Sequence, residues 1–204
     1  QFSSPNVPGT DGFYHIKMAY LIRTEAIKPD FPWLPPTMLN AREFYNHHFL
    51  YHVLMIPFTF GDLILGAKLA VVIFSAMAFW MVWYLLDQQK VPYSGAWAFG
   101  LLAVSEGFIL RMSIPRAQTL SLGLIALALH WLFIRRHKRL IALGFIFVWL
   151  YNAFPLLLLV AGAYTMSLWL TENRLDMRPL LYSTLGITAG LLINPYLPYN
   201  LVFI

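Results

Sequence analysis

Residues 63–86, LILGAKLAVVIFSAMAFWMVWYLL, decide the fold class of this chain. Lys68 is the only charged residue in the stretch, and about 18 or more apolar residues in a row are enough for a membrane span. At about 1.5 Å per residue a helix over this stretch would be roughly 36 Å long, which crosses a bilayer with some tilt. The stretch therefore predicts a membrane-spanning helix.

The composition of the whole chain agrees with this prediction. Of its 204 residues, 59% are hydrophobic and 11% are charged, whereas about a quarter of a soluble domain is charged. The sequence thus predicts an all-α polytopic membrane protein. We expect about six spans, at about 63–86, 93–110, 119–134, 140–154, 156–170 and 179–194.

Residues 1–62 differ from the remainder. They hold seven of the 13 prolines and four of the six histidines, and they contain no spanning run. We interpret them as one large outer loop with short interfacial helices, at about 11–27 and 41–54, and we assign residues 63–204 to the transmembrane bundle. Because Gln1 is not an initiator Met and Ile204 ends inside an apolar run, we expect a fragment cut at both ends.

Lys and Arg in short loops predict the orientation. Arg135–Arg139 is the strongest cluster, so we place it in the cytoplasm together with 87–90, and we place 111–118 outside with the large loop. Pro155 is interpreted as an outer turn, the alternative being a kink in one long helix. Topology thus accounts for the net charge of +5, and nucleic acid is not expected as a partner.

Polar side chains gather at the predicted outer ends of the spans. Ionisable groups there are costly and commonly functional, although the ends of spans also simply tolerate polar residues. The set consists of Asp62, Lys68, Glu106, Arg111, Arg116, Gln118, Asn152 and Asn194. Taken together, it predicts a site on the outer face.

Two segments of the large loop carry further candidate groups. Asp11 and His15 are four positions apart and would share a helix face. Asp11 can ligate a cation, act as a base or cap the helix, whereas His15 and Lys17 can meet a phosphate. The second segment is Asn46-His47-His48-Phe49-Leu50-Tyr51-His52, in which two histidines have a spacing that can hold one metal ion. The alternative is that its histidines are hydrogen-bonded to backbone or water.

The segment Asp11-Gly12-Phe13-Tyr14-His15-Ile16-Lys17 resembles a motif of the oligosaccharyltransferase catalytic subunit, Asp-x-Tyr-Tyr-His-hydrophobic-Arg, especially in its archaeal forms. That subunit belongs to the GT-C class of membrane glycosyltransferases. Asn46-His47-His48 is similar to the Asp-His-His of the family's second acidic motif, with Asn46 in place of Asp and before the first span. The later outer loop, 111–118, contains no acid, and Glu106 is its nearest carboxylate.

The resemblance implies a GT-C-like bundle that transfers a sugar or glycan from a polyprenyl-phosphate-linked donor to an acceptor. It places the protein in a cytoplasmic membrane, in contact with lipid, with its active face outside. The catalytic candidates are Asp11 and Glu106, and a divalent cation, Mg or Mn, would be held by Asp11, His47 and His48. The candidates for the donor phosphate are His15, Lys17, Arg111 and Arg116.

Two other functions are open from the sequence. A transporter or lipid flippase would use similar charges, but at the middle of the bilayer, whereas Lys68 and Glu106 are predicted near one surface. A non-catalytic membrane subunit is the other alternative, since the second acidic motif departs from the family pattern.

Overall fold

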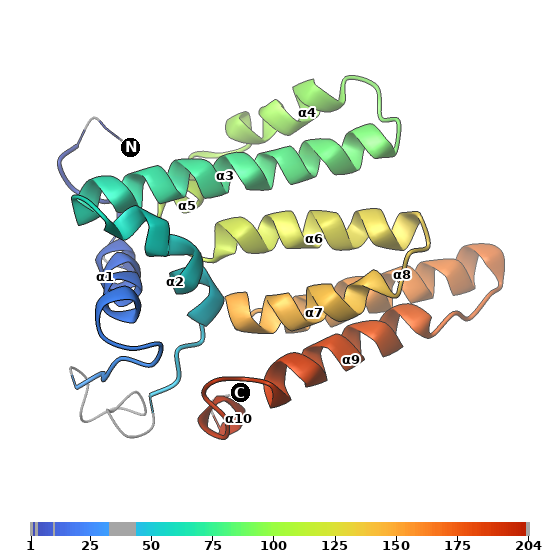
Figure 1. Cartoon of the computed structure of the whole chain (residues 1–204). Coiled ribbons are helices and arrows are strands. Elements are labelled where there is room, and N and C mark those ends of the chain that lie inside the picture. Colours follow the sequence, from blue (N-terminus) through green and yellow to red (C-terminus); the bar gives the residue numbers. More distant parts are fainter. Residues whose placement is uncertain (1, 3, 10, 33–43, 203–204) are drawn as a thin grey trace.

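The structure is a computed structural model that describes residues 2, 4–9, 11–32 and 44–202. Within these residues all regular elements are helices (Figure 1), so the all-α prediction is confirmed. In chain order they are α1 (Asp11–Thr24), α2 (Phe49–Met55), the 3-10 helix η1 (Ile56–Thr59), α3 (Leu63–Gln88), α4 (Ser94–Gly100), the 3-10 helix η2 (Leu101–Ala103), α5 (Glu106–Ser113), α6 (Gln118–Phe133), α7 (Arg139–Leu150), α8 (Pro155–Glu172), α9 (Arg178–Leu192) and α10 (Tyr199–Val202).

The longer helices α3, α6, α7, α8 and α9 run back and forth in one bundle (Figure 1). One end, here called the α1 end, holds the starts of α3, α6 and α8 and the last turns of α7 and α9, with α1 and α2 beside them. The opposite end, here called the far end, holds the loops 89–93, 134–138 and 173–177. The two basic segments that were assigned to the cytoplasmic side, 87–90 and 135–139, therefore share one end of the bundle.

Two helices, α3 with 26 residues and α8 with 18, are long and apolar enough to cross a membrane by length and composition. This is fewer than the six spans predicted. Helices α6, α7 and α9 have 16, 12 and 15 residues, which gives them about 24, 18 and 22 Å against a hydrocarbon thickness of about 30 Å. Apolar runs of this length also form buried core helices, and the sequence pattern does not separate the two cases.

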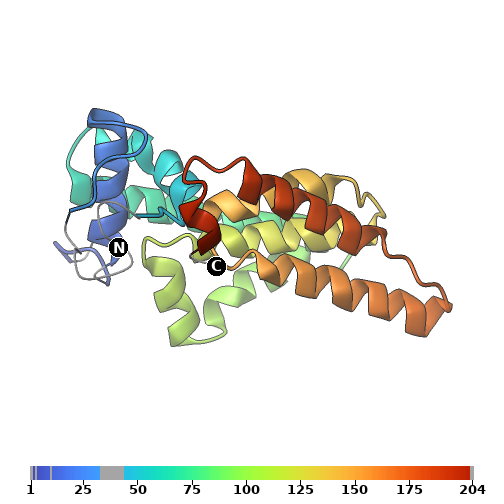
Figure 2. The ribbon, with the colours of Figure 1, turned by 90° about the horizontal axis from the view of Figure 1, so that it is seen from below.

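The predicted span over 93–110 is a bent pair of helices rather than one helix. The segment Ser94–Ala103 meets α5 at 94°, and the pair projects from the remainder of the bundle (Figure 2). Ser105 explains the break, because its backbone is extended and its hydroxyl accepts a hydrogen bond from the N–H of Phe108 at 3.1 Å, which caps α5. If the pair acts as one broken span, the number of spans rises to three.

Glycines allow helices α7 and α9 to approach very closely. A Cβ atom added at Gly186 would lie 2.2 Å from the carbonyl oxygen of Ile141, and one added at Gly190 would lie 3.0 Å from that of Phe145. The indole of Trp149 on α7 also donates a hydrogen bond to the carbonyl of Gly190 at 3.0 Å. Small residues at a helix crossing are typical of membrane bundles, where tight packing replaces the hydrophobic effect.

The α1 end is held together by contacts between α1, η1 and α3. Arg23, near the end of α1, donates to the hydroxyl of Thr59 at 2.8 Å and to its carbonyl at 3.1 Å. A Cβ atom at Gly66 would lie 1.9 Å from the carbonyl oxygen of Phe58, so α3 begins directly against η1. Lys68 is buried and donates to the carbonyl of Ser4. These contacts fix α1, and with it Asp11, against the bundle.

Candidate functional site

Asp11 and Arg116 form an ion pair at the α1 end. They come from different elements, since Asp11 is the first residue of α1 and Arg116 lies between α5 and α6. Gly12 explains how the two segments meet, because a Cβ atom there would lie 2.9 Å from the ring of Pro115. Both charged side chains keep access to solvent, at 42% exposure for Asp11 and 31% for Arg116. The pair is therefore within reach of a ligand.

Four histidines pack against one another beside this ion pair. Nδ1 of His15 and Nε2 of His52 are 2.7 Å apart, so one ring donates a proton to the other. The ring of His48 meets that of His15 edge-on, with centroids 4.9 Å apart, and its centroid is 4.1 Å from that of His47. His52 is fully buried, and its Nδ1 has no hydrogen-bond partner among the described residues.

His47 and His48 lie in a turn, not in the helix predicted over 41–54. Of that stretch, residues 41–43 lie outside the described residues, and α2 begins only at Phe49. Asn46 supplies the reason, because its side-chain oxygen accepts a hydrogen bond from the backbone N–H of His48 at 3.2 Å. Such a turn competes with the helix for the same backbone groups. It directs both histidines toward the ion pair.

These groups line a hollow of about 190 Å³, here called the site hollow. The amide of Gln118, in the first turn of α6, donates to the hydroxyl of Tyr151 at 3.1 Å. The Tyr151 ring stacks on His48, with centroids 5.5 Å apart. The full lining consists of Asp11, His15, His47, His48, Arg116, Gln118, Tyr151 and Asn152. Charged, imidazole, amide and phenol groups from five segments thus converge on one small space.

Burial keeps the histidines of this cluster neutral near pH 7. It lowers the pKa of His15 from 6.5 to about 4. Burial, together with the neighbouring histidines and Arg116, lowers the pKa of His48 to about 2. Burial also lowers the pKa values of His47 and His52. In the opposite direction, burial raises the pKa of Tyr51, which packs on His15. A neutral imidazole offers one hydrogen-bond donor and one acceptor, so the cluster presents hydrogen-bonding groups without charge.

Stability should fall as the pH is lowered from about 6.5 toward 4. In that window the unfolded chain binds protons at its histidines, whereas folded His15, with a pKa of about 4, does not. The shift corresponds to about 3 kcal/mol for His15. We expect the unfolding midpoint in detergent to drop between pH 7 and 4.5, and to drop less in His15→Asn, which keeps an amide near the position of Nδ1 but does not titrate. A midpoint that is flat over this range would contradict the assignment of buried neutral histidines.

Among the described residues, no group of three His, Asp or Glu side chains is placed to hold a metal ion. The proposed ligands Asp11, His47 and His48 all line the site hollow, but Asp11 is paired with Arg116 and the His48 ring is stacked on Tyr151. They do not form a ready ligand set as they stand. The Mg or Mn ion therefore stays a prediction.

Three candidates from the sequence do not line the site hollow. Glu106 and Arg111 are both exposed on α5. Glu106 is the first residue of this helix, so it lies about 10 Å along the helix axis from the last residue, Ser113. Lys17 is exposed, and its ammonium lies 4.6 Å from the ring centre of Tyr20. The structure thus brings together Asp11, His15, His47, His48 and Arg116, but leaves the second predicted carboxylate and two predicted phosphate ligands outside.

Other members of the outer polar set have structural partners. Asp62 caps α3 by accepting a hydrogen bond from the N–H of Leu65 at 2.7 Å. Asn194 accepts one from the N–H of Tyr196 at 2.9 Å. Tyr151, by contrast, lines the site hollow. It was not among the predicted site residues, because a tyrosine at the end of an apolar run is typical of an interfacial residue. The neighbouring Asn152, a member of the outer polar set, is the feature of the sequence that pointed to this position.

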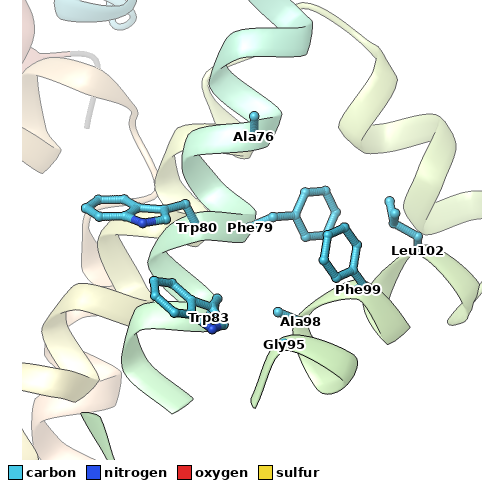
Figure 3. A pocket seen from close by; sticks show the side chains of 8 residues that line it. All are labelled: Ala76, Phe79, Trp80, Trp83, Gly95, Ala98, Phe99 and Leu102. Carbon is cyan, nitrogen blue, oxygen red and sulfur yellow. The ribbon is translucent and has the colours of Figure 1, made fainter. Parts of the chain in front are cut away.

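A larger hollow of about 410 Å³ lies between α3 and α4 (Figure 3). Its walls are Ala76, Phe79, Trp80, Trp83, Gly95, Ala98, Phe99 and Leu102. Apart from the two indole N–H groups, these side chains offer nothing for acid, base or phosphate chemistry. The larger hollow is therefore suited to hydrocarbon rather than to acid, base or phosphate chemistry.

Comparison with known proteins adds no relative to this description. No family model, curated protein or solved structure matches the chain.

Proposed function

We propose that the chain is part of an integral membrane glycosyltransferase of the GT-C kind, with the site hollow at its outer face. The single observation that carries the proposal is the Asp11–Arg116 pair beside neutral His15 and His48 in a hollow at one end of a helical bundle. Membrane insertion is supported by α3 and α8, since only 22% of the best apolar window of each helix is buried. Exposed apolar helix faces of this size are typical of surfaces that contact lipid or another protein.

The proposed donor is a polyprenyl-phosphate-linked sugar, and Arg116 is its phosphate ligand. Arginine binds phosphate in a bidentate manner and keeps its charge at all ordinary pH values. A phosphate that approaches Arg116 would replace the carboxylate of Asp11 as its partner. Binding of the donor would then release Asp11 for the acceptor in the same hollow.

In the proposed reaction, an acceptor hydroxyl or amide attacks the anomeric carbon of the sugar. The bond from that carbon to the phosphate oxygen breaks, and the lipid phosphate leaves with the electron pair, its charge offset by Arg116. The acceptor's proton passes to the carboxylate of Asp11. The carboxyl group of Asp11, which is open to solvent, then returns the proton to water.

The geometry favours this proposal over a transporter or flippase. A transport site is expected near the middle of the bilayer, on broken helices. The site hollow instead lies where α6 begins and α7 ends. The non-catalytic alternative is decided by the activity measurement that follows.

Arg116→Gln should lower the consumption of a polyprenyl-phosphate-linked hexose by about 100-fold, because the leaving phosphate loses its cation. The assay follows release of polyprenyl phosphate by membranes that contain the full-length protein, with a panel of hexoses. Arg111→Gln, which removes the same charge outside the hollow, should retain activity within about threefold. Equal losses in both variants would reject Arg116 as the specific phosphate ligand, and no consumption by the wild type would favour the non-catalytic alternative.

A further inference from the structure

The far end of the bundle carries a second polar hollow, remote from the site hollow. It has a volume of about 360 Å³ and is lined by residues 135–139 together with Arg178 and Tyr182. Here it is called the basic hollow. It lies between the loop that joins α6 to α7 and the start of α9.

The carboxylates near the basic hollow are already engaged. Both oxygens of Glu172 accept hydrogen bonds from Arg135 at 2.9 Å. The oxygens of Asp176 accept bonds from the guanidinium of Arg178 at 2.8 and 2.7 Å. Among the described residues, Arg136, Lys138 and Arg139 have no carboxylate within ion-pair distance. The hollow therefore holds three cations whose charge is not neutralised by the protein.

The backbone holds these cations in a fixed arrangement. The N–H of Arg136 donates to the carbonyl of Trp131 at 2.8 Å, and the N–H of Arg139 donates to the carbonyl of Arg136 at 3.1 Å. His137, only 5% exposed, lines the hollow, and its Nε2 has no hydrogen-bond partner among the described residues. Three cations that line one hollow without carboxylate partners point to an anionic ligand.

Aromatic side chains accompany the cations. The guanidinium of Arg139 lies over the ring of Trp131 at 5.6 Å, and Tyr182 lines the basic hollow itself. Trp and Tyr next to Lys and Arg are typical of the level of the lipid headgroups. The apolar helix α8 ends at Glu172, whose carboxylate binds Arg135, so the hollow is level with the end of a candidate span.

We propose that the basic hollow binds the phosphate headgroup of an anionic phospholipid in the leaflet opposite the site hollow. Arg136, Lys138 and Arg139 supply the charge that binds the phosphate oxygens. The inference rests on the membrane insertion under the proposed function, but not on the transfer reaction. A bilayer phosphate at this end would also hold the loop between α6 and α7 in place.

Binding of phosphatidylglycerol and phosphatidylcholine to the purified full chain in detergent tests this proposal. Native mass spectrometry counts the bound lipid, and the unfolding midpoint reports its effect. We expect a preference of about tenfold or more for phosphatidylglycerol. The triple variant Arg136→Gln/Lys138→Gln/Arg139→Gln should lose that preference, and Arg136→Gln alone, a milder change, should weaken it. Lys90→Gln, the same charge change at the same end but outside the hollow, should keep it.

Three outcomes would overturn the proposal: equal binding of the two lipids, an unchanged preference in the triple variant, or full competition by millimolar inorganic phosphate. Competition by inorganic phosphate would mean a site for free anions rather than for lipid. If the wild type transfers sugar but shows no lipid preference, only the lipid proposal fails. If the wild type shows the lipid preference but consumes no donor, only the proposed transfer function fails.

Discussion

Asp11→Asn should reduce donor consumption by about 100-fold or more, because it removes the base of the proposed reaction while keeping the shape of the side chain. Asn still accepts a hydrogen bond from Arg116, so the contact that joins α1 to the segment before α6 can persist. The expected loss is therefore in turnover rather than in folding. The measurement is polyprenyl phosphate released per minute at saturating donor, with the unfolding midpoint taken on the same preparation.

Glu25→Gln is the matched control for Asp11→Asn. Glu25 lies directly after α1 and is exposed, at the opposite end of that helix from Asp11. The change from carboxylate to amide is the same, so a general effect of lost negative charge would appear in both variants. Activity that is equal in Asp11→Asn and the wild type, at equal stability, would remove Asp11 from the reaction.

Gly186→Ala should destabilise the fold by about 2 kcal/mol or more. The added Cβ atom would lie 2.2 Å from the carbonyl oxygen of Ile141 and 2.8 Å from its carbonyl carbon. Backbone atoms cannot rotate away as a side chain can, so α9 would have to move off α7. The free energy of unfolding in mixed detergent micelles measures this directly.

Gly162→Ala is the counterpart of that change on α8. A Cβ atom there would meet only the tip of Leu180 at 3.8 Å, an ordinary contact. Alanine also has a higher helix propensity than glycine, by about 1 kcal/mol. We expect this variant to be as stable as the wild type or slightly more stable. If both glycine variants lost the same stability, the close approach of α7 to α9 would be wrong.

The sequence predicted well those features that depend on long local patterns. A helix over 63–86 is observed as Leu63–Gln88, because Asp62 caps its start and the apolar run continues without a break. Pro155 separates α7 from α8, in accord with a turn at that position. The number of spans was less predictable, since the apolar run that becomes α7 looks like a span but has only 12 helical residues.

The site was predictable only in part, because it depends on contacts between distant segments. Asp11 and Arg116 were both candidates, and Gly12 packed on Pro115 brings them together. Glu106 was expected beside them, but Ser105 starts a new helix that directs it elsewhere. The turn at Asn46 likewise depends on one side-chain hydrogen bond, which residue spacing does not reveal.

The most direct test of the account is the side of the membrane on which each end of the bundle lies. The chain has no cysteine, so Asn152→Cys in the site hollow and Lys138→Cys in the basic hollow are each a unique thiol. We predict that a membrane-impermeant maleimide added to intact cells labels Asn152→Cys and labels Lys138→Cys only after permeabilisation. Labelling of both thiols from the same side would contradict an outward-facing site on a membrane-crossing bundle.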